Sequence, residues 1–162
     1  MPLSKRLAAI AAHVRPGCRM VDIGTDHARL PIYIVKSGVV SAAVAADVAQ
    51  GPLNKARENI AAAGLDDRIE VVCSNGLKAI NPHIVDDIII AGMGGETIAE
   101  ILEAGGFSYL GHHRFILNPM SRPERLEKRL TAADFNITGH EIVIEGRRIY
   151  HIYVATKQIK EN

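Results

Sequence analysis

The sequence predicts an α/β fold built on a mostly parallel sheet of seven strands. Short apolar runs alternate with helical stretches five times along the chain. Two further extended segments follow, separated only by Gly146-Arg147, which predicts an antiparallel hairpin. The chain has 162 residues, of which 48% are hydrophobic, so it is the size of one domain with a substantial core. We therefore expect a single domain over residues 1–162.

The elements are predicted from the spacing of their apolar residues. Leu3, Leu7, Ile10 and Val14 recur at helical spacing and predict an N-terminal helix over 3–15. The β-branched run Ile88–Ile90 suits a strand that is buried on both faces. A short helical segment is expected after Gly76. The remaining expected strands are 19–24, 42–47, 69–73, 87–91, 114–118, 136–145 and 148–156, and the expected helices are 28–36, 52–63, 94–104 and 121–132.

The order of these elements narrows the fold class. Five strand–helix units followed by an antiparallel pair are typical of the Rossmann-like sheet of class I S-adenosylmethionine (SAM)-dependent methyltransferases, whose last strand is antiparallel. A dehydrogenase half-sheet would continue to alternate strand and helix. The sequence therefore predicts a class I methyltransferase fold.

Composition restricts the partners and the setting. Nineteen Lys and Arg residues oppose eighteen Asp and Glu residues, so the net charge of +1 does not itself indicate nucleic acid. The two cysteines, Cys18 and Cys73, form no zinc-site pattern, and we expect both to be buried in the core. No signal-peptide core or apolar run of about 18 residues occurs, which favours a cytoplasmic protein. We expect no membrane partner and no metal, and the sequence leaves the oligomeric state open.

Ligands of open α/β sheets bind beyond the carboxyl ends of the strands. The loop after the first strand has Asp26 and Ala28 where a nicotinamide-binding loop needs glycines. A carboxylate there would repel a diphosphate, whereas SAM has no phosphate and carries two cationic groups. We therefore expect Asp22, Gly24 and Thr25 to bind SAM. The alternative for Asp22 is a cap of the next turn.

Three more loops complete the expected cofactor site. Asp47, followed by Val48, is placed to accept hydrogen bonds from ribose hydroxyls. Asn75-Gly76 follows the third strand and is a candidate for reading the adenine edge. The alternative for Asp47 is an ordinary carboxylate at the start of a helix, and the alternative for Asn75-Gly76 is a tight turn. Gly92-Met93-Gly94, after the Ile-rich strand, keeps the backbone open to two bulky ligands.

The same glycine-rich segment bears on the acceptor. Enzymes that methylate exocyclic amino groups often have an Asn-Pro-Pro-aromatic or Asp-Pro-Pro-aromatic turn there, and this chain does not. A ring nitrogen is the better candidate. Asn118-Pro119, after the fifth strand, is either a polar wall of the cleft or a simple strand-ending turn.

Taken together, these segments resemble the bacterial tRNA (adenine(22)-N1)-methyltransferases, the TrmK family. The resemblance covers nearly the whole chain, and its specific strings are 22–28 (DIGTDHA) and 90–95 (IAGMGG), with 3–7 and 75–77 in the same order and spacing. That family carries a C-terminal helical domain after the methyltransferase domain. We expect this sequence, which ends after the hairpin, to be a truncation or a natural short form.

The resemblance implies transfer of a methyl group from SAM to N1 of an adenine in tRNA. Asp26 matches the family's motif and would accept a hydrogen bond from the adenine 6-amino group as the ring becomes positive. Its alternative is a helix cap. We group Asn118 with Asp26 as a catalytic candidate. One alternative is that the methyl acceptor is another RNA position or a small molecule. Another is that the chain is a SAM- or RNA-binding module with little activity.

A base in folded RNA must be unpaired or flipped out before N1 can react, so cations near the site would grip flanking phosphates. Substrate-binding candidates are Lys5, Arg6, His27 and Arg29, with further cations at Arg15, Arg122 and Arg125. Solvated surface charge is the alternative for the cations, and a structural imidazole for His27. Tyr33 and Tyr109 are candidate stacking platforms, with ordinary packing as the alternative, and His112-His113 is weak evidence of a metal site.

Overall fold

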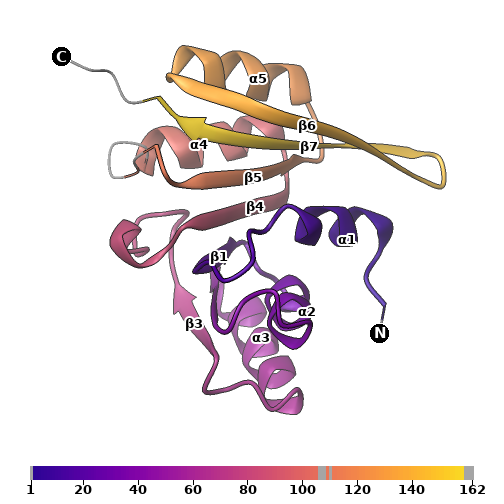
Figure 1. Ribbon diagram of the computed structural model, residues 1–162, viewed down its shortest axis with the longest axis vertical. Coiled ribbons are helices and arrows are strands. Elements are labelled where there is room, and N and C mark those ends of the chain that lie inside the picture. Colours follow the sequence, from indigo (N-terminus) through magenta and orange to yellow (C-terminus); the bar gives the residue numbers. More distant parts are fainter. Residues whose placement is uncertain (1, 106–108, 110, 159–162) are drawn as a thin grey trace.

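The computed structural model describes residues 2–105, 109 and 111–158. Its sheet has seven strands in the order β3-β2-β1-β4-β5-β7-β6 (Figure 1). The strands from β3 to β5 are parallel, whereas β7 is antiparallel to both β5 and β6. The predicted class I methyltransferase fold is confirmed. The strands are β1 (Met20–Ile23), β2 (Ala43–Asp47), β3 (Ile69–Cys73), β4 (Asp87–Met93), β5 (Arg114–Pro119), β6 (Phe135–Glu145) and β7 (Arg148–Lys157).

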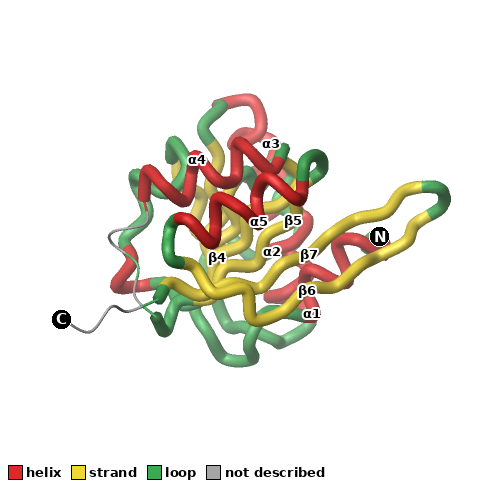
Figure 2. Tube along the Cα trace, turned by 90° about the horizontal axis from the view of Figure 1, so that it is seen from above, coloured by secondary structure: helices red, strands yellow, loops and turns green. Residues whose placement is uncertain are grey.

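Helices cover both faces of the sheet and divide the core in two. One apolar cluster lies under α1 (Lys5–Ala12), α2 (Arg29–Lys36) and α3 (Gln50–Ala62). The other lies under α4 (Gly95–Gly105) and α5 (Pro123–Ala132), and a short 3-10 helix, η1 (Pro82–Ile84), precedes β4. The β6–β7 hairpin extends beyond the body of the molecule, with α1 alongside it (Figure 2).

The Ile-rich strand lies where its sequence predicts. In β4, Ile88 and Ile90 pack into the α4–α5 core while Ile89 packs into the opposite one, and all three side chains are fully buried. Successive residues of a strand face opposite sides, so a continuous apolar run marks a strand covered on both faces. This strand lies beside β1 at the centre of the sheet.

Two expectations about local structure are wrong. The segment after Gly76 is a turn rather than a helix, because the Ser74 hydroxyl donates to the Gly76 carbonyl and accepts from the Ala79 amide, which closes the chain on itself. Cys73 is exposed and Cys18 only half-buried, so neither lies fully in the core. Cys73 ends β3, which forms one edge of the sheet over the described residues.

Candidate active site

The loop between β1 and α2 has an unusual backbone that is held at several points. Gly24, Asp26 and Ala28 all have positive φ angles, of 70°, 54° and 59°. The Asp26 amide donates to the Asp47 carboxylate at 3.2 Å, and Asn59 Nδ2 of α3 donates to the His27 carbonyl at 2.8 Å. Left-handed non-glycine residues persist only where their surroundings fix them, and they cluster at functional sites.

This loop directs Asp26 outward. Its side chain is 68% exposed and its Oδ2 lies 3.6 Å from Nε2 of His27. The N-cap position of α2 is Ala28, and no side chain caps that helix. The alternative interpretation, that Asp26 caps α2, is therefore wrong, and its carboxylate stays available to a ligand.

The first cleft, of about 390 Å³, opens at the carboxyl ends of the parallel strands. The Asp47 carboxylate at its edge accepts hydrogen bonds from its neighbours' amides, at 2.8 Å from Val48 and 3.2 Å from Ala49, as well as the one from Asp26. Three backbone donors thus fix the orientation of the carboxylate. The predicted cofactor residues that line this cleft are Gly24, Asp47, Val48, Asn75, Gly76 and Met93.

The second cleft, of about 440 Å³, shares Gly24 with the first. A side chain at Gly24 would overlap with Met93 Cε, and the positive φ angle independently favours glycine there. The junction of the two clefts thus favours a residue without a side chain. The predicted site residues that line the second cleft are Arg6, Asp22, Gly24, Thr25, Asp26, His27, Arg29 and Gly92. Gly94 lines neither cleft.

Asp22 is a buried carboxyl group at the floor of the second cleft. Burial raises its pKa to about 7, and the negative charge of Asp47 adds to this rise. The neighbouring Thr25 side chain and the charge of Arg6 act in the opposite direction, toward a lower pKa. The group therefore changes its charge near neutral pH, and a cation bound beside it would favour the charged form.

Arg6 reaches the second cleft from α1 and is held from behind by Asn118. Its Nη1 donates to Asn118 Oδ1 at 2.8 Å, and its guanidinium lies 5.7 Å from the centroid of the Tyr150 ring. Asn118 is completely buried, and its Nδ2 donates to the His151 carbonyl at 2.9 Å. Asn118 therefore does not line either cleft itself and contacts the site through Arg6.

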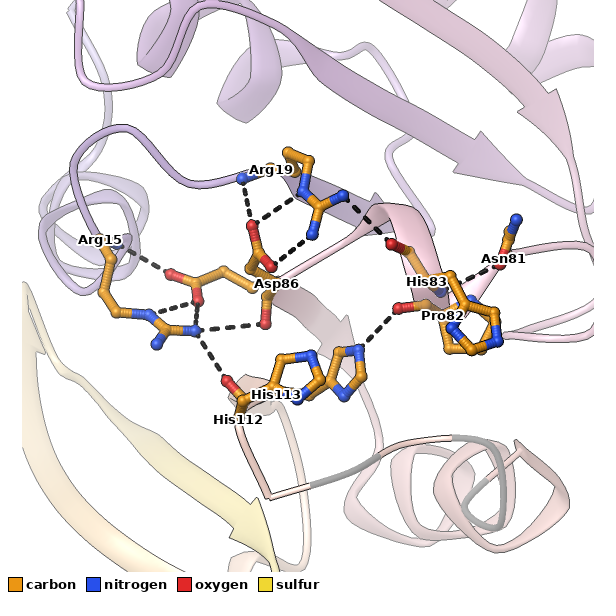
Figure 3. Close-up of polar contacts among 9 residues, drawn as sticks. Arg15, Arg19, Asn81, Pro82, His83, Asp86, His112 and His113 are labelled. Atoms are coloured by element: carbon orange, nitrogen blue, oxygen red, sulfur yellow. Dashed lines mark hydrogen bonds and ion pairs between the residues drawn. The ribbon is translucent and has the colours of Figure 1, made fainter.

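Only some of the cations predicted to bind RNA lie at the clefts. Arg15 lies at the amino-terminal end of β4, away from the clefts. Its amide and its Nε each donate to the carboxylate of Asp87, the first residue of β4, at 2.8 Å (Figure 3). This pairing corrects the interpretation of Arg15 as an RNA contact. Arg125 forms an ion pair with Glu96, and Lys5, exposed on α1, lines neither cleft.

The two adjacent histidines belong to the same distant network. Arg15 donates to the His112 carbonyl at 3.1 Å, and His113 Nε2 lies 2.7 Å from the Pro82 carbonyl oxygen (Figure 3). Over the described residues, no group of three His, Cys, Asp or Glu side chains is arranged to hold a metal ion. Of the tyrosines proposed for stacking, Tyr109 is buried and Tyr33 is 43% exposed.

One wall of the first cleft was not predicted from the sequence. Thr97, Ile101 and Ala104 of α4 line it, with Glu100 between them. Their spacing of four and three residues places them on one helix face, which is the signal that could have identified them. Met120, just after β5, likewise lines the second cleft.

Comparisons with known proteins agree with this geometry. Residues 3–153 match the family model described as a methyltransferase domain. The chain is 37% identical, over 155 residues, to the tRNA (adenine(22)-N(1))-methyltransferase of Bacillus subtilis. The chain belongs to the tRNA (adenine(22)-N1)-methyltransferase family. This alignment covers 96% of the chain but 65% of the Bacillus protein, so the chain spans less than two thirds of that relative.

Solved structures of the family superimpose closely on the chain. The putative tRNA (m1A22) methyltransferase of Streptococcus pneumoniae, in complex with SAM, is 39% identical with a TM-score of 0.90, over 99% of this chain and 76% of that one. M. capricolum TrmK, in complex with S-adenosyl-homocysteine, is 31% identical with a TM-score of 0.83, over 96% of this chain and 69% of that one.

Within the described part of the chain, no helix is long and apolar enough to cross a membrane.

Proposed function

We propose that this chain transfers a methyl group from SAM to N1 of an adenine in tRNA. The observation that carries the proposal is the position of Asp26, an exposed carboxylate on a fixed loop beside the junction of two clefts. The names of the Bacillus and Streptococcus relatives support the same reaction. A tRNA substrate would place the reaction in the cytoplasm.

The residues of the first cleft fit the adenosine part of SAM. Asp47, oriented by backbone amides, presents carboxylate oxygens to ribose hydroxyls, and Asn75 and Gly76 face the opening where an adenine ring would lie. Gly24 and Gly92 leave the backbone open where the two clefts adjoin. Asp22 provides a negative charge for a cationic ligand group once it has lost its proton. When bound, SAM supplies a methyl group on a positively charged sulfur.

The acceptor adenine needs no general base, since N1 already holds an in-plane lone pair at neutral pH. As N1 gains the methyl group, the ring becomes positively charged and shares that charge with its 6-amino group. A hydrogen bond from this amino group to the Asp26 carboxylate strengthens as the charge develops, so it lowers the barrier. Asp26 is held in place by its own amide, which donates to Asp47.

The other predicted substrate residues act around this reaction. Arg6, His27 and Arg29 line the second cleft and present positive or polar groups to the target nucleotide. Asn118 is a positioning residue, because its amide oxygen holds Arg6. Lys5, exposed at the start of α1, would contact RNA phosphates beyond the cleft.

The proposal is tested by methyl transfer from labelled SAM to unmodified tRNA. We expect Asp26→Ala to lower kcat by about 100-fold, the scale of losing one group that stabilises developing charge, while SAM binding measured by calorimetry changes little. Asp26→Asn keeps a hydrogen-bond acceptor without the charge and should lose less. Asp66→Ala, an exposed carboxylate in the turn before β3, is the matched control and should behave like the native chain.

Two results would count against the proposal. Full activity of Asp26→Ala would remove Asp26 from the mechanism. SAM binding by the native chain without methylation of any tRNA would instead favour a SAM-binding module or another acceptor.

A further inference from the structure

A third cavity lies outside the two clefts, between the N-terminal segment, α2 and α3. Its volume is about 700 Å³, larger than either cleft. Arg29, Tyr33 and Lys36 line it from α2, and Lys55 and Asn59 line it from α3. We call this cavity the α2–α3 groove.

The lining residues follow the helical repeat. Arg29, Tyr33 and Lys36 are separated by four and three residues and so share one face of α2. Lys55 and Asn59, four residues apart, share one face of α3. Both helix faces therefore present polar and cationic side chains to the groove, while Pro2, Leu3 and Ile32 add apolar surface.

The charge of the groove is of one sign. Its charged lining residues among those described are Arg29, Lys36 and Lys55, and the lining contains no carboxylate. Two carboxylates lie just outside the lining: Glu58 Oε2 forms an ion pair with Lys55 Nζ at 3.4 Å, and Asp26 Oδ2 lies 3.6 Å from His27 Nε2. Tyr33 is 43% exposed, so its ring is open to a ligand that occupies the groove. A concave site with several cations and an exposed ring suits a polyanion with flat bases.

The groove is continuous with the proposed reaction site. His27 and Arg29 line both the second cleft, beside Asp26, and the α2–α3 groove. Asn59 joins them, since its Nδ2 holds the His27 carbonyl at 2.8 Å. A nucleotide whose base lies against Asp26 would thus send its neighbouring phosphates toward Arg29.

We propose that the α2–α3 groove binds the single-stranded stretch of RNA next to the target adenosine, with one flanking base stacked on Tyr33 and its phosphates near Arg29, Lys36 and Lys55. This inference rests on the proposed function for the identity of the substrate. It assigns the second half of the substrate site to α2 and α3, on the side of the sheet covered by α1. Unstacked, unpaired nucleotides are what a base-extruding enzyme must hold beside its target.

The test compares variants by fluorescence anisotropy, using an unmodified tRNA transcript labelled at its end. Tyr33→Ala should weaken binding about tenfold, whereas Tyr33→Phe keeps the ring and should bind like the native chain. Lys36→Ala should lower the slope of log affinity against log salt by about 1, the effect of losing one phosphate contact. Lys128→Ala, an exposed lysine on α5 beyond the other face of the sheet, is the matched control and should leave both affinity and slope unchanged.

The KM for tRNA and the affinity for SAM separate this proposal from the previous one. We expect Tyr33→Ala and Lys36→Ala to raise KM while SAM affinity stays native. Native tRNA affinity, salt slope and KM in both variants would overturn the groove as an RNA site, with the proposed function intact. If the native chain methylates no tRNA, the proposed function fails, and the anisotropy comparison still decides whether the groove binds RNA.

Discussion

Asp22 links the chemistry of one residue to the pH response of the site. Its side chain is buried and its pKa is raised from 3.8 to about 7, chiefly by burial. In the protein without ligand, folding therefore favours the protonated form of the Asp22 carboxyl group. This contribution to stability is fully present below about pH 4 and declines as the pH rises through about 7.

Ligand binding should show the opposite trend with pH. A cationic ligand such as SAM favours the ionised carboxylate, so its affinity should rise about tenfold between pH 6 and pH 8 for a group that titrates near 7. Asp22→Asn should bind SAM more weakly at pH 8 and lose this pH dependence. Calorimetric titration with SAM at both pH values checks the prediction. Equal pH dependence in the native chain and the variant would show that another group titrates.

At the scale of single residues, the sequence identified most of the polar groups that line the clefts. Asp22, Asp26 and Asp47 lie at or just beyond the carboxyl ends of β1 and β2, and parallel strands place these ends on the same side of the sheet. The role of Arg15 could not be predicted in the same way. Its partner, Asp87, is 72 residues away in the sequence, and only the folded chain brings the two together.

The loop between β1 and α2 shows how an element depends on its backbone. Gly24 has a φ angle of 70°, and a side chain there would meet Met93 Cε. Gly24→Ala should therefore lower the free energy of unfolding by about 1 kcal/mol, the cost of a left-handed non-glycine residue, and should also weaken SAM binding. Gly64 has nearly the same φ angle, 69°, with no atom within 4 Å of an added side chain. Gly64→Ala should match the loss of stability and keep native SAM affinity.

Chemical denaturation and SAM titration of both variants test this pairing. If Gly64→Ala weakened SAM binding as much as Gly24→Ala, general destabilisation would explain both results. A loss of SAM affinity confined to Gly24→Ala would assign the glycine to the junction of the clefts.

The segment between α1 and β1 is held against the start of β4 by charge. Asp87 is completely buried and is bound by the amide and guanidinium of Arg15, whereas the neighbouring pair of Arg19 and Asp86 is more exposed. Arg15→Ala leaves a buried carboxylate without its cation and should lower the free energy of unfolding by about 3 kcal/mol. Arg19→Ala should lower it far less. Urea unfolding of the two variants makes the comparison, and equal losses would contradict the importance of burial.

Elements were predictable where their residues repeat with a clear period. The β3 strand, 69–73, was predicted with its observed bounds, as was the two-residue turn of the hairpin. The segment after Gly76 was not, because the Ser74 side chain closes a turn there and a single hydroxyl has no periodic signature. The α4 wall of the first cleft was not predicted, because the spacing of Thr97, Ile101 and Ala104 indicates a shared helix face while only the folded chain shows that this face borders the cleft.

At the scale of the whole molecule, the strand order explains why the site lies where it does. β1 and β4 are adjacent at the centre of the sheet, and the chain reverses direction across it there, first toward β3 and then toward β5. Loops at such a switch point diverge and leave a crevice, which here is divided into two clefts around Gly24. The net charge of +1 gives no overall attraction for RNA, so recognition must depend on local cations such as Arg6 and Arg29.

The central claim is that this chain methylates N1 of an adenine in tRNA, and the identity of the product nucleoside tests it most directly. The chain would be incubated with SAM and unmodified tRNA, and the RNA digested to nucleosides and separated by mass spectrometry against methylated adenosine standards. The account predicts 1-methyladenosine, at about one per tRNA, and its loss in Asp26→Ala. N6-methyladenosine as the product, or no methylated nucleoside while SAM is bound, would contradict it.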